Sequence, residues 1–472
     1  MIYPTKMKDE KWMRAAETVV WEIREMDDEG RRIPQDLRRR AEHLPADPAA
    51  AEAEAREIYA RLEKIPDDPA GQAREPDALE AIRALRCAAP ALEPFEGDLV
   101  DRILGGWLGR CAGCLLGQPV ESWMQDRITG FLRDTGNYPI SRYLSSDLPE
   151  ELRQKWDICD GPGPYDALHM NWVNLITGME EDDDVNYTVF ALKILERVGR
   201  NFTSEDVAHG WVSSLPFLLT CSAERVAYRN IVNLMEPPCC ASYHNPYREW
   251  IGAQIRSDLF GWVNPCDPET AADMAWRDAR ISHTKNGIYG SMFVAGMCAA
   301  AFGCRTAEQV ILQGLGQIPA ESRLAVQVRR VLAWYREGLC AEDAVARIHA
   351  EWNEASEYDW CHVIPNAMLV SIALLWGGGD FTRTIGIAVQ AGFDTDCNGA
   401  TAGSVLGVML GGRAIPAVWT EPMRNTVRSG VHGYAGGTFT EMAERTAALA
   451  KLSFARECPC ENNNIKTVEA TK

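Results

Sequence analysis

Apolar residues recur at helical spacing through most of the chain after about residue 96. Residues that return every three or four positions form one face of an amphipathic helix. Two such stripes consist of Val185, Val189, Leu192 and Leu195, and of Val326, Val328, Val331 and Leu332. Alternating β-branched runs between hairpin signals are nearly absent, and no strand–helix alternation is visible. The pattern predicts an all-α fold, with one compact multi-helix domain over residues 96–457.

The regions at both ends differ from this central pattern. Residues 1–95 are dense in Ala, Glu, Arg and Asp and are interrupted by prolines, which predicts an N-terminal extension of a few short helices. We expect this extension to serve packing or oligomerisation. Residues 458–472 are polar and are expected to form a mobile tail. Within the domain, Met235 to Pro268 is rich in Pro, Cys, Tyr and Trp, which predicts a long structured loop that lines a binding site.

The composition limits the classes of partner. A formal net charge of −19 over 472 residues argues against nonspecific binding to nucleic acid or to an anionic membrane, because the average field repels both. A phosphate-bearing substrate would need a local cation. The fifteen cysteines are scattered without the repeated C-x-x-C spacing of zinc sites, so we interpret them as reduced. The N-terminus is charged and no apolar stretch is long enough to cross a bilayer, so we expect a cytoplasmic protein.

Two acidic clusters stand at predicted helix starts. Glu180–Asp184 is a run of five carboxylates directly before the first apolar stripe, and Asp394 and Asp396 precede a helix rich in small residues. Taken by itself, the first cluster could be explained as a solvent-exposed helix N-terminus with several acidic residues, which the helix dipole stabilises. Carboxylates at the threshold of a buried helix, however, are normally paired, hydrogen-bonded or metal-bound. Two such clusters predict one shared site for a hard cation such as Mg²⁺ or Mn²⁺.

Three motifs follow one another in a recognisable order. Gly105–Gly109 and Gly113–Glu121 come first, Glu181–Asp184 second, and Gly392–Cys397 third. Together they resemble the ADP-ribosylglycohydrolase family, whose corresponding motifs are an opening helix with G-D-A-x-G-x-x-x-E, then T-D-D-T, then G-G-D-T-D-T. The likeness extends over roughly residues 100–425. It implies an all-α domain with one or two divalent cations, usually Mg²⁺ or Mn²⁺, at the base of a cleft that receives ADP-ribose.

The resemblance assigns roles by position. It implies metal ligands at Glu181, Asp182, Asp183, Asp394, Asp396 and Cys397. Asp184 is an alternative ligand, because the acidic run can be aligned with the family motif in two ways that differ by one residue. It places Glu121 near the scissile bond. Hydrolysis of a ribosyl bond passes through an oxocarbenium-like transition state and needs a positioned water and acid assistance to the leaving group. Glu121, Asp183 and Asp396 are therefore the predicted catalytic residues.

Three positions depart from the family pattern. Cys114 stands where the family has an aspartate, and Cys397 and Glu181 stand where it has threonines. A thiol is a soft ligand that suits Mg²⁺ poorly. We therefore expect one cation to bind normally at the site. We expect the second to be weak, absent, or replaced by Mn²⁺.

Three further residues are candidates for substrate binding. Asn245 and Arg256 lie in the predicted loop, where an arginine can contact a phosphate, and His283 belongs to a Ser-His pair that also resembles a family feature. Polar packing within the core is the alternative for each.

Three functions follow as hypotheses. The first is a glycohydrolase that removes an ADP-ribosyl group from a protein or small molecule. The second is a divergent enzyme that cleaves another N-glycoside. The third is a non-catalytic protein that binds a ribosyl phosphate.

Overall fold

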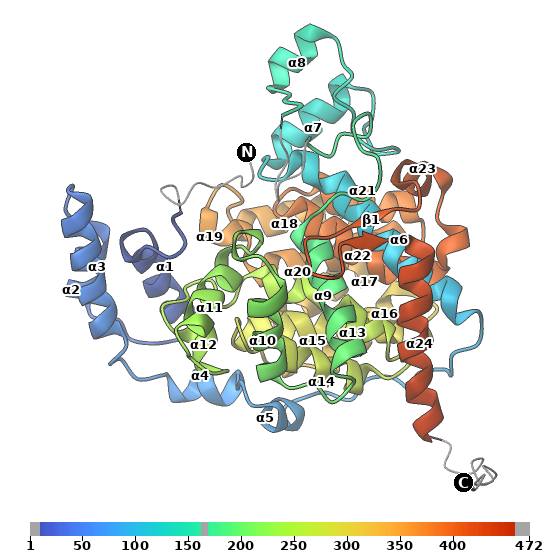
Figure 1. Ribbon diagram of the computed structural model, residues 1–472. Coiled ribbons are helices and arrows are strands. Elements are labelled where there is room, and N and C mark those ends of the chain that lie inside the picture. Colours follow the sequence, from blue (N-terminus) through green and yellow to red (C-terminus); the bar gives the residue numbers. More distant parts are fainter. Residues whose placement is uncertain (1–9, 162–168, 458–472) are drawn as a thin grey trace, which may run out of the picture.

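A computed structural model describes residues 10–161 and 169–457 of the chain, and the regular secondary structure in these ranges is almost entirely helical (Figure 1). The prediction of an all-α fold is confirmed. Over the described ranges, the strands are the short pair β1 (Val427–Arg428) and β2 (Gly436–Gly437), which form one antiparallel ladder. No described helix combines the length and the apolar composition that a membrane span requires. The predicted mobile tail, residues 458–472, lies outside the described residues.

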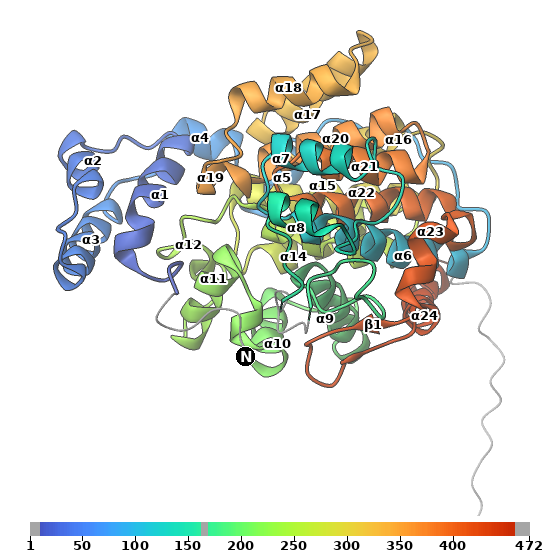
Figure 2. The same cartoon turned by 90° about the horizontal axis from the view of Figure 1, so that it is seen from above.

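Five helices form the N-terminal extension. They are α1 (Ala15–Asp28), α2 (Gln35–Glu42), α3 (Pro48–Leu62), α4 (Pro69–Arg74) and α5 (Leu79–Ala84). The helices α1 to α3 enclose a small core of their own, which includes Val19, Ile23 and Ile58. Figures 1 and 2 show these three helices at one side of the larger domain, while α4 and α5 run along it. The expected role of the extension in oligomerisation stays a prediction.

The larger domain begins with α6 and ends with α24. Its first half comprises α6 (Leu99–Gly117), η2 (Gln118–Val120), α7 (Gln125–Asp134), α8 (Glu150–Trp156), α9 (Asp183–Arg197), α10 (Ser204–Ser214), η3 (Phe217–Leu219), α11 (Ser222–Val232), α12 (Cys239–Ser242), η4 (Ile251–Arg256), α13 (Asp258–Trp262) and α14 (Pro268–Ala279). Its second half comprises α15 (Lys285–Ala300), α16 (Ala307–Leu315), α17 (Arg323–Arg336), α18 (Ala341–Glu351), α19 (Glu357–Trp360), α20 (Val363–Gly377), α21 (Phe381–Gln390), α22 (Thr395–Leu410), η5 (Gly412–Ala414), α23 (Ala417–Thr420), η6 (Glu421–Met423) and α24 (Phe439–Glu457).

Most of the helical pattern in the sequence is present in the structure. The stripe from Val185 to Leu195 is the buried face of α9. In α17, Val328, Val331 and Leu332 are buried, but Val326 is exposed because two residues turn a helix by about 200°. The predicted long loop from Met235 to Pro268 was wrong in part, since it contains α12, η4 and α13.

A stripe of glycines brings α6 and α22 into backbone contact at the centre of the domain. Gly105, Gly109 and Gly113 of α6 face Gly407, Gly403 and Gly399 of α22. A Cβ atom at Gly109 would lie 2.1 Å from the carbonyl oxygen of Gly403, so that only glycine fits. The two helices run in opposite directions along this contact, which places the start of α22 beside the end of α6.

Candidate metal centre and cleft

The first acidic cluster forms the start of α9. Asp182 caps this helix, and its carboxylate accepts a hydrogen bond from the backbone N–H of Asp184 (3.0 Å). Asp182 and Asp184 are fully buried, and Asp183 is nearly so. The cap fixes the backbone, and the two aspartates after it have their charges on the first turn, where the helix dipole is favourable to them.

One buried arginine neutralises part of this charge. Arg110 of α6 contacts Asp184 Oδ1 through Nη2 (2.7 Å) and Asp258 Oδ2 through Nη1 (2.7 Å), and its Nε donates to the Asp184 carbonyl oxygen (2.8 Å). This fully buried guanidinium therefore fixes the start of α9 to α6 and α13. The other oxygen of Asp184, Oδ2, has no hydrogen-bond partner.

The second acidic cluster forms the start of α22. Gly392 (φ +77°) and Phe393 (φ +56°) adopt left-handed backbone, which turns the chain sharply before Asp394. Thr395 anchors the turn to the end of α6, because its hydroxyl donates to the Gly117 carbonyl oxygen (2.9 Å). The amide of Asn366 on α20 accepts from the Asp394 N–H (3.3 Å).

The two clusters meet at Asp184. Cys114, Asp182 and Asp184 form one buried group whose ligand atoms all lie within 4.8 Å of one another, and Asp184, Asp396 and Cys397 form a second. Asp394 and Asp396 lie close enough together that, after burial, the Asp396 charge contributes most to raising the pKa of Asp394. The starts of α9 and α22, 212 positions apart in the sequence, thus converge on one acidic centre.

The donor atoms of this centre fit divalent cations. Four carboxylate oxygens are buried without a hydrogen-bond partner: Asp182 Oδ2, Asp184 Oδ2, Asp394 Oδ1 and Asp396 Oδ1. Burial, and next the neighbouring carboxylates, raise the pKa of Asp182 and Asp394 well above their ordinary values. For Asp184 burial raises the pKa most, although Arg110 opposes the shift. Such a set is stable when a cation binds it or when protons neutralise it.

A cleft of 470 Å³ opens above this centre. Asp183, Asp394, Asp396 and Cys397 line its floor, where all four side chains are almost inaccessible. Glu121, directly after η2, lines the same cleft. Burial and the charges of Asp396 and Asp394 raise the pKa of Glu121 well above its ordinary value. The predicted catalytic residues Glu121, Asp183 and Asp396 thus border one space.

Glu181 and the predicted substrate-binding residues lie elsewhere. The Glu181 carboxylate accepts from Asn186 (3.4 Å) and, in the part of the chain described, it belongs to neither close group. Arg256 is fully buried and paired with Glu224 (2.7 Å) and Asp278 (2.5 Å). His283 contacts the hydroxyl of Ser282 (2.8 Å), and the Asn245 amide donates to three backbone carbonyl groups. Glu224 itself lines the cleft, so Arg256 lies behind the cleft wall.

Sequence reasoning missed one member of the site. Arg110 lies on α6, about 70 residues before the first acidic cluster, and no local pattern marks it as a counter-charge. Cys114, which stands at an aspartate position of the family motif, lies in the same close group as Asp182 and Asp184. The signal that was available is the glycine spacing of four on α6, which matches that on α22. That match indicates that the two helices pack together and so bring Cys114 near Asp396.

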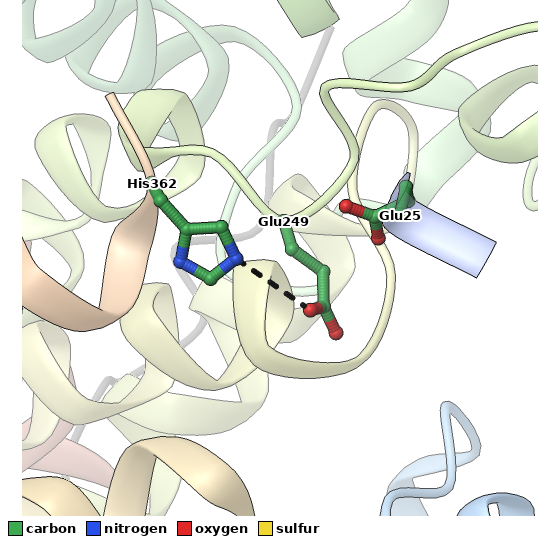
Figure 3. Close-up of side chains that lie close together, drawn as sticks. All are labelled: Glu25, Glu249 and His362. Carbon is green, nitrogen blue, oxygen red and sulfur yellow. Dashed lines mark ion pairs between the residues drawn. The ribbon is translucent and has the colours of Figure 1, made fainter. Parts of the chain in front are cut away.

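A third close group does not suit a metal ion. Glu25, Glu249 and His362 are buried together, with His362 Nε2 3.9 Å from Glu249 (Figure 3). His362 Nδ1 accepts from the Ile364 N–H (3.2 Å), which places the proton of the neutral ring on Nε2, the nitrogen a metal would need. Arg323 also contacts Glu249 at 2.7 Å. The group is therefore an N–H donor facing two carboxyl groups.

The chain is similar to known proteins in two comparisons. The family model described as ADP-ribosylglycohydrolase matches residues 96–456. Among solved structures, a chain of an "ADP-ribosylglycohydrolase-related protein complex" is similar at 19% identity, with a TM-score of 0.39, over 75% of this chain and 99% of that one. No curated protein matches the sequence.

Proposed function

Because the chain belongs to the ADP-ribosylglycohydrolase family, we propose that it is a divalent-metal-dependent hydrolase of a ribosyl N- or O-glycosidic bond, most simply that of an ADP-ribosyl group. The observation that supports this best is the convergence of both acidic helix starts on Asp184, beside a cleft whose floor Asp183, Asp394 and Asp396 line. The substrate is then a free small molecule or an ADP-ribosylated side chain. Neither a nucleic acid nor a membrane is expected as a partner.

The proposal gives the aspartates the role of holding the cation. Asp182, Asp184, Asp394 and Asp396 each have a buried oxygen without a partner, and Asp183 and Cys397 border the same floor. One or two Mg²⁺ or Mn²⁺ ions bound here would orient ribose hydroxyls and polarise a water. We place Asp184 ahead of Glu181 in the ligand set, because Asp184 is the member that the two close groups share.

In this proposal, carboxyl groups that line the cleft transfer the protons that hydrolysis requires. Glu121 lines the cleft but belongs to neither close group, so its carboxyl is available to act on a substrate atom. In the proposed mechanism Glu121 gives a proton to the leaving group, and Asp183 or Asp396 orients the attacking water on the cleft floor.

A second candidate function follows from the charge of the cleft. Seven carboxylates line it, Glu121, Asp183, Glu224, Glu354, Glu357, Asp394 and Asp396, whereas Lys11 is the single lysine or arginine among the described lining residues. Lys11 already pairs with Glu357 (2.8 Å). This balance favours a substrate without phosphate groups, such as a nucleoside-like N-glycoside.

One screen tests both candidates. ADP-ribosylated peptides, free ADP-ribosyl compounds and nucleosides are incubated with the enzyme and Mg²⁺ or Mn²⁺, and released base or ribose is measured, with and without chelator. The first candidate predicts turnover of ADP-ribosyl compounds, and the second predicts turnover of nucleosides alone. Binding of ADP-ribose without any turnover would instead support the third hypothesis, a non-catalytic protein that binds a ribosyl phosphate.

A further inference from the structure

The N-terminal segment before α1 reaches the cleft. Lys11 and Trp12 line the same 470 Å³ space as Asp394 and Asp396. Both residues precede the range that the family model matches, which begins at residue 96. The extension, which the sequence led us to regard as a packing appendage, therefore contributes directly to the wall of the cleft.

Contacts at three successive residues hold this segment in place. Glu10 forms a buried ion pair with Arg225 of α11 and accepts from the Trp12 N–H (2.9 Å). The Arg225 guanidinium also lies 5.0 Å from the Trp12 ring centre. Lys11 pairs with Glu357 of α19 across the rim, where both side chains are exposed. The segment is therefore fixed at the outer side of the cleft, with the buried aspartates at the opposite, inner end.

Aromatic side chains gather on this part of the wall. Trp12, Trp250 and Trp360 all line the cleft. The indole N–H of Trp360 donates to the Phe393 carbonyl oxygen (2.8 Å), whereas the buried indole N–H of Trp250 has no partner in the described structure. A buried N–H without an acceptor is costly, and a ligand with an acceptor atom at this position would satisfy it.

We propose that Trp12 and Trp250 form a subsite for a planar heterocyclic ring of the substrate, on the side of the cleft where the extension docks. The inference rests on the proposed function, because it takes the aspartate floor as the place of the ribosyl group. Trp12 supplies apolar ring surface and Trp250 supplies the hydrogen-bond donor. The extension thereby determines which substrates bind, and the aspartates determine the reaction.

Calorimetric titration with two ligands tests the subsite without turnover. ADP-ribose contains a heterocyclic ring and ribose 5-phosphate does not, and both are titrated in the presence of Mn²⁺ into wild type, Trp12→Ala, Trp12→Phe and the control Tyr138→Ala, an exposed aromatic residue outside the cleft. We expect Trp12→Ala to weaken ADP-ribose binding about three- to tenfold, and to leave ribose 5-phosphate unchanged. Trp12→Phe should restore most of the loss, and Tyr138→Ala should match wild type.

Each other outcome overturns the subsite. These outcomes are equal binding of ADP-ribose to wild type and Trp12→Ala, weaker binding of both ligands together, as after a structural change, and no binding of ADP-ribose to wild type. Failure of the proposed function has a different signature. In that case no ribosyl compound is hydrolysed, while the Trp12 dependence of ADP-ribose binding remains.

Discussion

Gly113 of α6 faces Gly399 of α22 so closely that a Cβ atom at Gly113 would lie 1.9 Å from the Gly399 carbonyl oxygen. The contact is backbone against backbone, so no flexible side chain can move aside. Gly113 directly precedes Cys114, and Gly399 follows Cys397 by two residues, so the separation of the two helices affects the geometry of the acidic centre.

Gly113→Ala should therefore affect stability and metal binding together. We expect a loss of about 1–3 kcal/mol of unfolding free energy from overpacking, which corresponds to a fall in Tm of roughly 1–4 °C for a chain of this size. Metal affinity should fall as α22 moves away from α6. Thermal melts and Mn²⁺ titration measure both effects. Gly386→Ala, where the nearest atom to a Cβ is 3.3 Å away, serves as the control, and an unchanged melt of Gly113→Ala would contradict the account.

Cys397→Thr tests the cysteine at a threonine position of the family motif. Cys397 lines the cleft and lies in the close group with Asp184 and Asp396, so its sulfur replaces an oxygen at the centre. Mg²⁺ requires oxygen ligands at roughly 2.0–2.1 Å. We expect the variant to gain Mg²⁺ affinity or a second Mg²⁺ in calorimetric titration, while the exposed-site control Cys87→Thr stays like wild type. Identical two-site binding in all three proteins would show that Cys397 is not a ligand.

The sequence predicted the two helix starts because their signals are local. Acidic residues directly before a helical stripe identified Asp182 and Asp394, and both do lie at the starts of buried helices. The partners of these residues could not be predicted in the same way. Arg110 and Cys114 reach the centre only because α6 packs on α22, and that depends on tertiary structure.

The placement of the extension was not predictable either. Its composition indicated short helices, and α1 to α5 are such helices. Their docking depends on single long-range pairs, such as Arg248 with Glu22 (2.9 Å) and Glu29 (3.0 Å), which leave no periodic signal. For the same reason the lining of the cleft by Trp12 was not expected.

Glu25→Gln should change how stability depends on pH. Burial, and then the Glu249 charge, raise the pKa of Glu25 well above its ordinary value of 4.5 in the folded protein. The folded state thus holds the proton more tightly than the unfolded state, so this group's contribution to stability is full below pH 4.5 and is lost as pH rises toward the folded pKa. Glutamine resembles the protonated carboxyl and can still accept from the Tyr358 hydroxyl, which lies 2.6 Å from Glu25.

We therefore expect Glu25→Gln to raise Tm at pH 8.5 by roughly 1 °C or more, which is about 1 kcal/mol for a chain of this size, and to change it little at pH 5. Melts across this pH range measure the difference. Glu17→Gln, on an exposed part of α1, is the matched control. An equal shift at both pH values would mean that Glu25 is ionised in the folded protein.

The central claim is that two acidic helix starts form one metal centre, and a Mn²⁺ anomalous difference map from crystals of the full chain tests it most directly. The account predicts at least one strong peak at the cleft floor, among the carboxylates of Asp182, Asp184, Asp394 and Asp396, and a peak lost in Asp394→Asn. A map with no peak among these four residues at millimolar Mn²⁺ would contradict it.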